Sequence, residues 1–505
     1  MKKIIILFLS IQLLLAGCTN DFDPVLHGNL NPENFPSTEE DFTLYTLEVY
    51  KPFGSKWGYS VPGGWQGNFH SYEYGHIFMF DGPSDLISVY ENGWGAFFEA
   101  VTRGDFEYFL SQGKDTSHLP KMRFVTRITM IIDSLEKADI DEATKLQLLA
   151  EAKLARAWVM YYLLHLYGPV PVILDASLVG TEAEWDVTRP SRETFVAAIE
   201  SDLQFASDAA NGLPDTAWTG DNYGRFTRGF AMTLLMRLYM NERDFVKAEQ
   251  VGSAITSLGY GLVTEGENPY KSLFELKTQR NSELIFSITV DAESTGDEAT
   301  GNINAWTYYC YPGDFPGEYQ GGGWSSPHGV FMADWDFYDS FDSADKRKEM
   351  LVGSYDGTWG ETRDRTNMNG AVIVKYPEDV NNPGGFQGND IVIARYSDVL
   401  LMLAEAINEN SGPTAEAIAL VNQVRNRAGL EDLTAAETTD KATFNDAILR
   451  ERSWELFFEG VRKMDLIRHG KWESSLQANG KQNAHQLLPI PLFGLDMGIQ
   501  QNDGY

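Results

Sequence analysis

The segment Leu146–Tyr167 (LQLLAEAKLARAWVMYYLLHLY) places the strongest constraint on the fold. It is long, rich in Ala and Leu, and followed by Gly168-Pro169. Gly and Pro stop helices, so the segment predicts one long helix that ends at Tyr167. Apolar residues cover most of its circumference, which is typical of a helix that is well buried.

Other segments repeat this pattern with shorter helices. Phe124–Leu135 has helical apolar spacing, Ser191 and Thr227 stand at expected N-caps, and Gly259 follows a helical segment that starts at Asp244. Helices of this length, joined by short turns of Gly, Pro and Asn, predict a tetratricopeptide-like helical repeat scaffold. We expect these helices at 124–135, 146–167, 191–210, 227–240 and 244–258.

The residue composition of the chain changes between residues 289 and 389, where Gly, Pro, Asp and aromatic residues dominate. A long irregular stretch inside a compact protein is usually functional or disordered, and the aromatic content argues against disorder. Helical spacing returns at 390–410, 414–428 and 442–468. The sequence therefore predicts one mainly α domain over 37–505, with a helical core at about 38–288 and 390–470 and a loop-rich, aromatic-rich insertion at about 289–389.

The first residues predict export and a lipid anchor. Two lysines precede the apolar stretch Ile4–Leu15, and Ala16-Gly17-Cys18 follows it. This order is typical of a secretory signal peptide, and the position of the cysteine resembles the lipobox of bacterial lipoproteins. We expect residues 1–17 to be removed, Cys18 to carry acyl chains that hold the protein to a membrane, and residues 18–36 to form a tether. The alternative is a plain signal peptide with an incidental cysteine.

Composition narrows the chemistry further. The chain has 40 basic and 72 acidic residues and a net charge of −32. Such a surface repels phosphate backbones, so nucleic acid is not an expected partner. With Cys18 consumed by lipid, Cys310 has no intramolecular disulfide partner. Its neighbours are Tyr308, Tyr309 and Tyr311, so we expect it to pack among aromatic side chains rather than to react.

Several segments match the motifs of one family in order and spacing. Alone each motif is weak, but together they extend over the chain from residue 18 to residue 505. Ser453-Trp454 replaces a more basic pair, and Asp503 stands where Pro is common. The matching segments are Glu151–Tyr162 with Tyr167–Pro171, Ala394–Ala406, Val421–Gly429, Arg450–Asp465, and Leu488–Pro491 with Gln501–Tyr505. With these motifs the chain resembles the SusD/RagB family of nutrient-binding outer-membrane lipoproteins.

The resemblance implies a function as well as a fold. Family members bind oligosaccharide or polysaccharide at the cell surface, sit as a lid on a SusC-like TonB-dependent transporter, and pass the ligand into its barrel. The implied location is the outer membrane, lipid-anchored and facing the cell exterior, and the implied role is not that of an enzyme. A minority of members take other ligands such as peptides. Ligand-contacting residues vary within the family and have no fixed motif, so none is carried over.

Aromatic residues in loops are the candidates for a sugar site. Sugars present flat C–H patches and a rim of hydroxyls, so their sites need exposed aromatic platforms with polar partners nearby. Two regions fit, 57–94 and 306–324. The competing interpretation is that these aromatics fill the core beneath the loops. We expect platform residues among Trp65, Trp94, Trp306, Tyr308 and Trp324, of which Trp65 and Trp324 rank first because of their Gly flanks, and hydroxyl partners in Asn68 and Asp85.

Signatures of catalysis or metal binding do not emerge from the sequence. Glu451 and Glu455 alternate with Arg450, Arg452 and Arg462, which favours ion pairs over an acid/base pair. There is no G-x-S-x-G, H-E-x-x-H or P-loop motif, and the eight His residues lack metal-ligand spacing. We therefore expect no catalytic residue, no metal and no cofactor. Three functions stay open: glycan binding, the same scaffold binding peptides or another nutrient, and a lipid-anchored glycoside hydrolase, which needs two carboxylates across a cleft.

Overall fold

The computed structural model describes residues 35–56, 58–61, 64–91, 96–114, 116–218, 222–290, 302–317, 329–378, 386–481 and 485–505. For residues 58–61 and 64–66 it describes the backbone alone. The predicted signal peptide, the predicted lipid anchor at Cys18 and nearly all of the predicted tether lie outside these ranges. Within them, every helix is too short or too polar to cross a bilayer.

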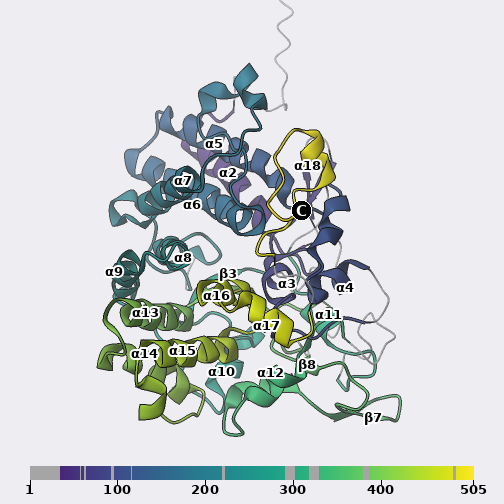
Figure 1. Ribbon diagram of the computed structural model, residues 1–505. Coiled ribbons are helices and arrows are strands. Elements are labelled where there is room, and N and C mark those ends of the chain that lie inside the picture. Colours follow the sequence, from purple (N-terminus) through teal and green to yellow (C-terminus); the bar gives the residue numbers. More distant parts are fainter. Residues whose placement is uncertain are drawn as a thin grey trace, which may run out of the picture.

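Long helices stack one on the next and form one side of the molecule (Figure 1). Each helix from α5 to α8 packs on its successor, α9 packs on α13, and α13 contacts both α14 and α15. The tetratricopeptide-like scaffold predicted from the sequence is thereby confirmed. These helices are α2 (Glu39–Thr46), α5 (Met122–Glu136), α6 (Glu142–Tyr167), α7 (Arg192–Ser207), α8 (Arg228–Asn241), α9 (Phe245–Ile255), α13 (Tyr396–Ser411), α14 (Ala415–Arg427) and α15 (Lys441–Leu456).

The N-caps expected from the sequence are present. Ser191 Oγ accepts a hydrogen bond from the Thr194 N–H at 3.2 Å, and Thr227 Oγ1 accepts one from the Phe230 N–H at 3.1 Å. Each bond satisfies a donor that the first turn of a helix leaves without an intrahelical partner. At the other end of α6, Gly168 has a φ of +78°, which glycine adopts without steric cost.

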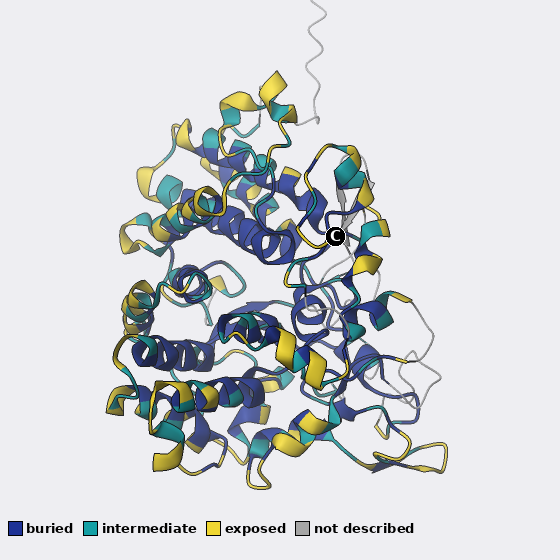
Figure 2. Cartoon of the chain, in the orientation of Figure 1, coloured by how far each residue is buried: buried dark blue, intermediate teal, exposed yellow. Residues whose placement is uncertain are grey.

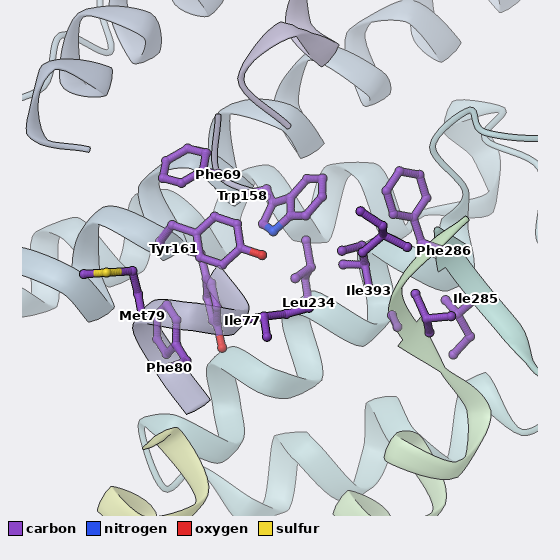
Figure 3. Close-up of a cluster of buried hydrophobic side chains, with 14 of the residues drawn as sticks. Phe69, Ile77, Met79, Phe80, Trp158, Tyr161, Leu234, Ile285, Phe286 and Ile393 are labelled. Carbon is purple, nitrogen blue, oxygen red and sulfur yellow. The ribbon is translucent and has the colours of Figure 1, made fainter. Parts of the chain in front are cut away.

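Helix α6 lies at the centre of the packing, as its apolar circumference predicts. Nearly all of its residues from Leu148 to Tyr167 are buried, and Figure 2 shows the helix as a continuous buried stretch. The Trp158 ring stacks on Phe53 with centroids 3.9 Å apart and meets the Phe230 ring edge-on at 4.8 Å. Figure 3 shows Trp158 among side chains from four other elements, α3, α8, β3 and β9.

One short sheet replaces residues that were expected to be helical. Strand β3 (Leu284–Ile288) pairs antiparallel with β9 (Ile391–Arg395), and the helix expected from residue 390 begins at Tyr396 instead. All residues of both strands are buried. The β-branched run Ile391-Val392-Ile393 suits a strand covered on both faces, and this preference outweighs the helical spacing.

The single helix expected over 442–468 is broken into α15 and α16 (Arg462–Arg468). Between them Phe458 and Gly460 have φ values of +58° and +73°. The Asp81 carboxylate accepts hydrogen bonds from the backbone N–H groups of Glu459, Gly460 and Arg462 at 2.9–3.0 Å. These bonds replace the helical ones, and their acceptor lies far away in the sequence.

The loop-rich side of the molecule carries short elements, with α4 and α11 on the right in Figure 1. A three-stranded sheet with the order β4-β8-β5 and two hairpins, β1-β2 and β6-β7, stiffen it. The remaining helices are α3 (His76–Asp81), α4 (Ala96–Arg103), α10 (Pro269–Ser272), α11 (Trp306–Cys310), α12 (Trp335–Ser340), α17 (Trp472–Ala478) and α18 (Leu492–Asp496). The strands are β1 (Gly58–Val61), β2 (Gly64–Gly67), β4 (Met332–Ala333), β5 (Leu351–Val352), β6 (Tyr355–Asp356), β7 (Thr362–Arg363) and β8 (Ala371–Ile373).

Candidate ligand-binding site

Three of the aromatic residues predicted to form a platform are not placed by the structure. Trp94 and Trp324 lie outside the described residues, and Trp65 is described as backbone alone, in β2 opposite Ser60. They stay predictions.

Trp306 lies in the core rather than at a surface. It is 2% exposed, and its ring meets Phe458 edge-on with centroids 4.7 Å apart. On the same short helix, α11, Tyr309 and Cys310 are also buried. Trp306 therefore has no ring face open to a ligand, which corrects the expectation that it forms part of a platform.

The two expected hydroxyl partners are occupied by structural contacts. Asn68 is fully buried, and its Nδ2 donates to the Lys56 carbonyl at 3.0 Å. Asp85 accepts two hydrogen bonds from Arg462, at 2.8 and 2.7 Å. Burial alone would raise the pKa of Asp85, but the Arg462 guanidinium outweighs it and lowers that pKa. Asn68 has no surface open to a ligand, which corrects its expected role, and Asp85 joins segments 377 residues apart.

Tyr308 is the predicted platform residue that the structure places at a surface. It is half-buried, and its ring lies nearly parallel to that of Phe386, at 8° with centroids 6.0 Å apart. Burial raises the pKa of the Tyr308 phenol, and the nearby Glu73 carboxylate raises it further, so the ring stays neutral at physiological pH. We refer to these two rings as the Tyr308–Phe386 platform.

The scaffold fixes both rings of this platform. The Gln387 N–H donates to the Asn304 carbonyl at 2.7 Å, and Asn304 Oδ1 accepts from the Trp306 N–H at 3.1 Å. The neighbouring Tyr309 hydroxyl donates to Glu73 Oε1 at 2.6 Å. A rigid aromatic surface beside polar groups is suited to stacking against a sugar ring. Phe386 escaped prediction because its partner lies 78 residues earlier in the chain.

Another feature is a pocket of about 450 Å³ between the 3-10 helix Leu47–Phe53, residues 223–225 and strand β3. We refer to it as the Lys56 pocket. Its walls come from three separate parts of the chain, around residues 47–56, 223–225 and 286–302, so no local motif marks it. Lys51, Lys56 and Arg225 line it together with the rings of Tyr50 and Tyr223.

Other reactive groups are enclosed by the fold. Cys310 is buried, and burial raises the pKa of its thiol well above the usual range, which suppresses thiolate chemistry. Burial also lowers the pKa of His70 to about 3. Among the residues that the structure describes, no three His, Cys, Asp or Glu side chains are placed to hold a metal ion.

The glutamates of the Arg450–Asp465 motif form ion pairs, but not with the arginines beside them. Glu451 pairs with Arg347 and Arg425, at 2.7 and 2.9 Å. Glu455 pairs with Arg347, Arg395 and Arg427. The expected neighbours pair elsewhere: Arg450 with Glu437, Arg452 with Asp398 and Asp465, and Arg462 with Asp85. The prediction of ion pairs is confirmed, and the partners come from other elements.

Comparison with known proteins gives consistent matches. Two family models match, "SusD family" over residues 282–488 and "Starch-binding associating with outer membrane" over residues 121–240. The SusD-like protein P2 of Formosa agariphila is 26% identical over 97% of each chain. A SusD-like protein of Bacteroides ovatus is 22% identical over 92% of this chain and 82% of its own.

Solved structures share the fold. A laminarin-binding SusD-like protein superposes with a TM-score of 0.73 at 22% identity, covering 93% of this chain and all of its own. Surface glycan-binding protein A from Bacteroides thetaiotaomicron, solved with laminarihexaose, also gives 0.73, at 20% identity over 92% of this chain and all of its own. The sequence motifs, the helical scaffold and these matches agree, and together they support the SusD-like family for this chain.

Proposed function

We propose that this chain is a non-catalytic, glycan-binding lipoprotein of the outer-membrane surface. It captures oligosaccharide or polysaccharide and delivers it to a SusC-like TonB-dependent transporter. The observation that carries the proposal is the Tyr308–Phe386 platform, two nearly parallel half-buried rings on the loop-rich side of the helical scaffold.

The platform matches the chemistry of a sugar. The apolar C–H face of a pyranose packs on an aromatic ring, and the outer faces of a stacked pair of rings offer such a surface. Because the bonds around Asn304 hold the platform in place, little ordering entropy is lost on binding. Capture of this kind needs no bond to be broken.

Relatives support the class of ligand and the location. Two proteins with the same fold are named for laminarin binding and for a laminarihexaose complex, and one matching family model is described as starch-binding and associated with the outer membrane. The lipobox-like position of Cys18 supports anchoring by acyl chains. The first described residue, Phe35, packs edge-on against Tyr45 of α2 at 5.9 Å, so the segment after the anchor joins the helical side.

Affinity electrophoresis of the purified protein against plant, microbial and host polysaccharides tests the proposal. We expect retardation by at least one glycan. Tyr308→Ala and Phe386→Ala should each weaken binding about tenfold, since a well-packed aromatic contact contributes roughly 1 kcal/mol beyond its buried area. Trp65→Ala and Trp324→Ala test the two unplaced platform candidates. Trp185→Ala is the matched control, because that ring is 75% exposed on a different element, Glu182–Trp185.

The outcomes separate the rival functions. Binding of peptides but of no glycan would move the ligand to another nutrient class. Release of shorter sugars from a bound polymer would indicate a hydrolase.

Delivery is tested by co-purification with the transporter from outer membranes and by glycan uptake. Cys18→Ala should release the protein from the membrane fraction while leaving glycan retardation unchanged.

A further inference from the structure

The Lys56 pocket has the opposite charge character from the rest of the chain. Lys51, Lys56 and Arg225 line it, and none of the described lining residues is an Asp or Glu. The whole chain, by contrast, has a net charge of −32. A cationic, partly enclosed pocket on a strongly acidic protein concentrates anions where the surrounding surface repels them.

Among the described residues, three acidic residues near the pocket already have partners. Buried Glu151 accepts from Arg225 Nη2 at 2.6 Å and from the Tyr50 hydroxyl at 2.8 Å. Glu48 pairs with Lys51 Nζ at 2.6 Å and with Arg127 at 3.0 Å. Asp390 accepts from the Tyr223 hydroxyl. Within the described part of the chain, Lys56 has no ion-pair partner, so its charge is available to a ligand.

Arg225 also keeps donor capacity. Its side chain is 30% exposed, and its contact with Glu151 uses one terminal nitrogen. Its Nε has no hydrogen-bond partner among the described residues, but that atom is buried, so the exposed part of the guanidinium is what a ligand can reach. A guanidinium that a buried carboxylate holds in place presents its exposed part in a fixed orientation, which suits charge-assisted contact with a carboxylate ligand.

The other walls are apolar and hydroxylated. The Tyr50 ring stacks on Phe226 with centroids 4.2 Å apart, which fixes one aromatic wall, and Tyr223 supplies another. Ser287 and Thr289 contribute hydroxyl groups. A volume of about 450 Å³ lies within the range of small-molecule sites. The pocket thus combines ring-sized apolar walls, hydroxyls and cations.

We propose that the Lys56 pocket binds a carboxylate-bearing sugar ring, a uronic acid, either free or as a residue of a glycan chain. Lys56 and Arg225 contact the carboxylate, while the tyrosine rings pack against the sugar. A bare tetrahedral anion would use the cations but not the aromatic walls. This site is separate from the Tyr308–Phe386 platform, so either proposal can fail without the other.

Isothermal titration of the purified protein tests the site with galacturonic acid, trigalacturonic acid and the methyl ester of trigalacturonic acid. We expect an acid to bind, binding to weaken as salt increases, and the ester to lose at least about fivefold in affinity, since it keeps the rings but removes the charges. Equal affinity for the monomer and the trimer identifies a free sugar acid as the ligand, and tighter binding of the trimer identifies a glycan residue.

Variants place the binding in the pocket. Lys56→Gln should weaken acid binding at least about fivefold, and Lys137→Gln, which removes a 73% exposed lysine at the C-cap of α5, should leave it unchanged. Arg225→Gln alone would leave the buried Glu151 carboxylate without its ion-pair partner. It is therefore combined with Glu151→Gln, and the melting temperature of the double variant is measured. Tyr308→Ala should not alter acid binding. The proposal is overturned if the ester binds as well as the acid, if Lys56→Gln has no effect, or if inorganic sulfate binds as tightly as trigalacturonate.

Discussion

Arg347 and Glu451 form an ion pair that is closed off from solvent. Arg347 Nη1 donates to Glu451 Oε1 at 2.7 Å, and neither side chain has any exposed surface. Arg347 lies on the 3-10 helix Lys346–Met350, between α12 and α13, whereas Glu451 lies on α15. The pair therefore joins the loop-rich side of the molecule to the helical scaffold.

This pair belongs to a larger buried network of ion pairs. Its cations and carboxylates are equal in number, so their formal charges cancel, and every member contacts a charge of opposite sign. Mutual neutralisation is what allows so many charges to lie inside a protein. The members are Arg347, Lys375, Arg395, Arg425 and Arg427, with Glu283, Asp345, Glu451, Glu455 and Glu459.

Arg347→Met is expected to destabilise the protein by about 3–5 kcal/mol. The substitution keeps much of the side-chain volume but leaves Asp345, Glu451 and Glu455 with less positive charge in a medium that cannot solvate them. Urea unfolding followed by far-UV circular dichroism measures the change.

A surface ion pair supplies the control for that substitution. Arg365 and Asp339 are 2.6 Å apart, with side chains that are 52% and 51% exposed. Water solvates either partner when the other is removed, so Arg365→Met should cost less than about 1 kcal/mol. Equal losses for the two variants would show that the buried network contributes no more than an ordinary surface contact.

Local sequence patterns predicted the elements whose stability is local. Ser191 and Thr227 cap the helices that their positions indicated, and Gly168 ends α6. The predictions fail where a residue that is distant in sequence determines the local structure. Arg395 ends β9, whose pairing with β3 could not be seen from its own neighbours. Asp81, far from residue 460 in sequence, breaks the predicted last helix.

The candidate site follows the same division. Spacing on α11 does not reveal which of its aromatic residues faces inward, because that depends on Phe458 and Phe331, which lie elsewhere in the chain. The aromatic composition of residues 306–324 predicts Tyr308 as a candidate. The contact of Tyr308 with Phe386 and the Lys56 pocket, by contrast, form only when distant segments fold together.

Lys463→Met is expected to stabilise the protein by a few kcal/mol near neutral pH. Lys463 is buried among Phe80, Phe106 and Trp472, and burial lowers its pKa from 10.5 to about 7. Between about pH 7 and 10.5 the unfolded chain binds more protons at this residue than the folded chain does, so this destabilisation decreases as pH rises. The gain from Met should therefore be greatest at pH 7 and below and vanish toward pH 10.5, as measured by unfolding at several pH values.

Lys375→Met should have the opposite effect. Burial lowers the pKa of Lys375 to about 8, but its Nζ donates to Glu459 Oε1 at 2.6 Å. Removing it withdraws a cation from a buried carboxylate, which should cost about 2–4 kcal/mol even though Arg395 remains beside Glu459. If Lys375→Met and Lys463→Met changed stability in the same direction, the ion pair of Lys375 with Glu459 would not determine the effect of removing the lysine.

Gly460→Ala should destabilise the protein by about 3 kcal/mol or more. Gly460 has a φ of +73°, and a Cβ there would lie 2.5 Å from Cδ2 of the buried His76 ring. Gly470 has a similar φ, +66°, but a Cβ at that position meets no atom within 4 Å. Gly470→Ala should therefore cost only the backbone term of about 1–2 kcal/mol. The difference between the two variants in urea unfolding isolates the steric contact with His76. Similar losses would mean that the break between α15 and α16 yields to fit the added methyl group, and that the packing of Gly460 on His76 does not hold this turn in place.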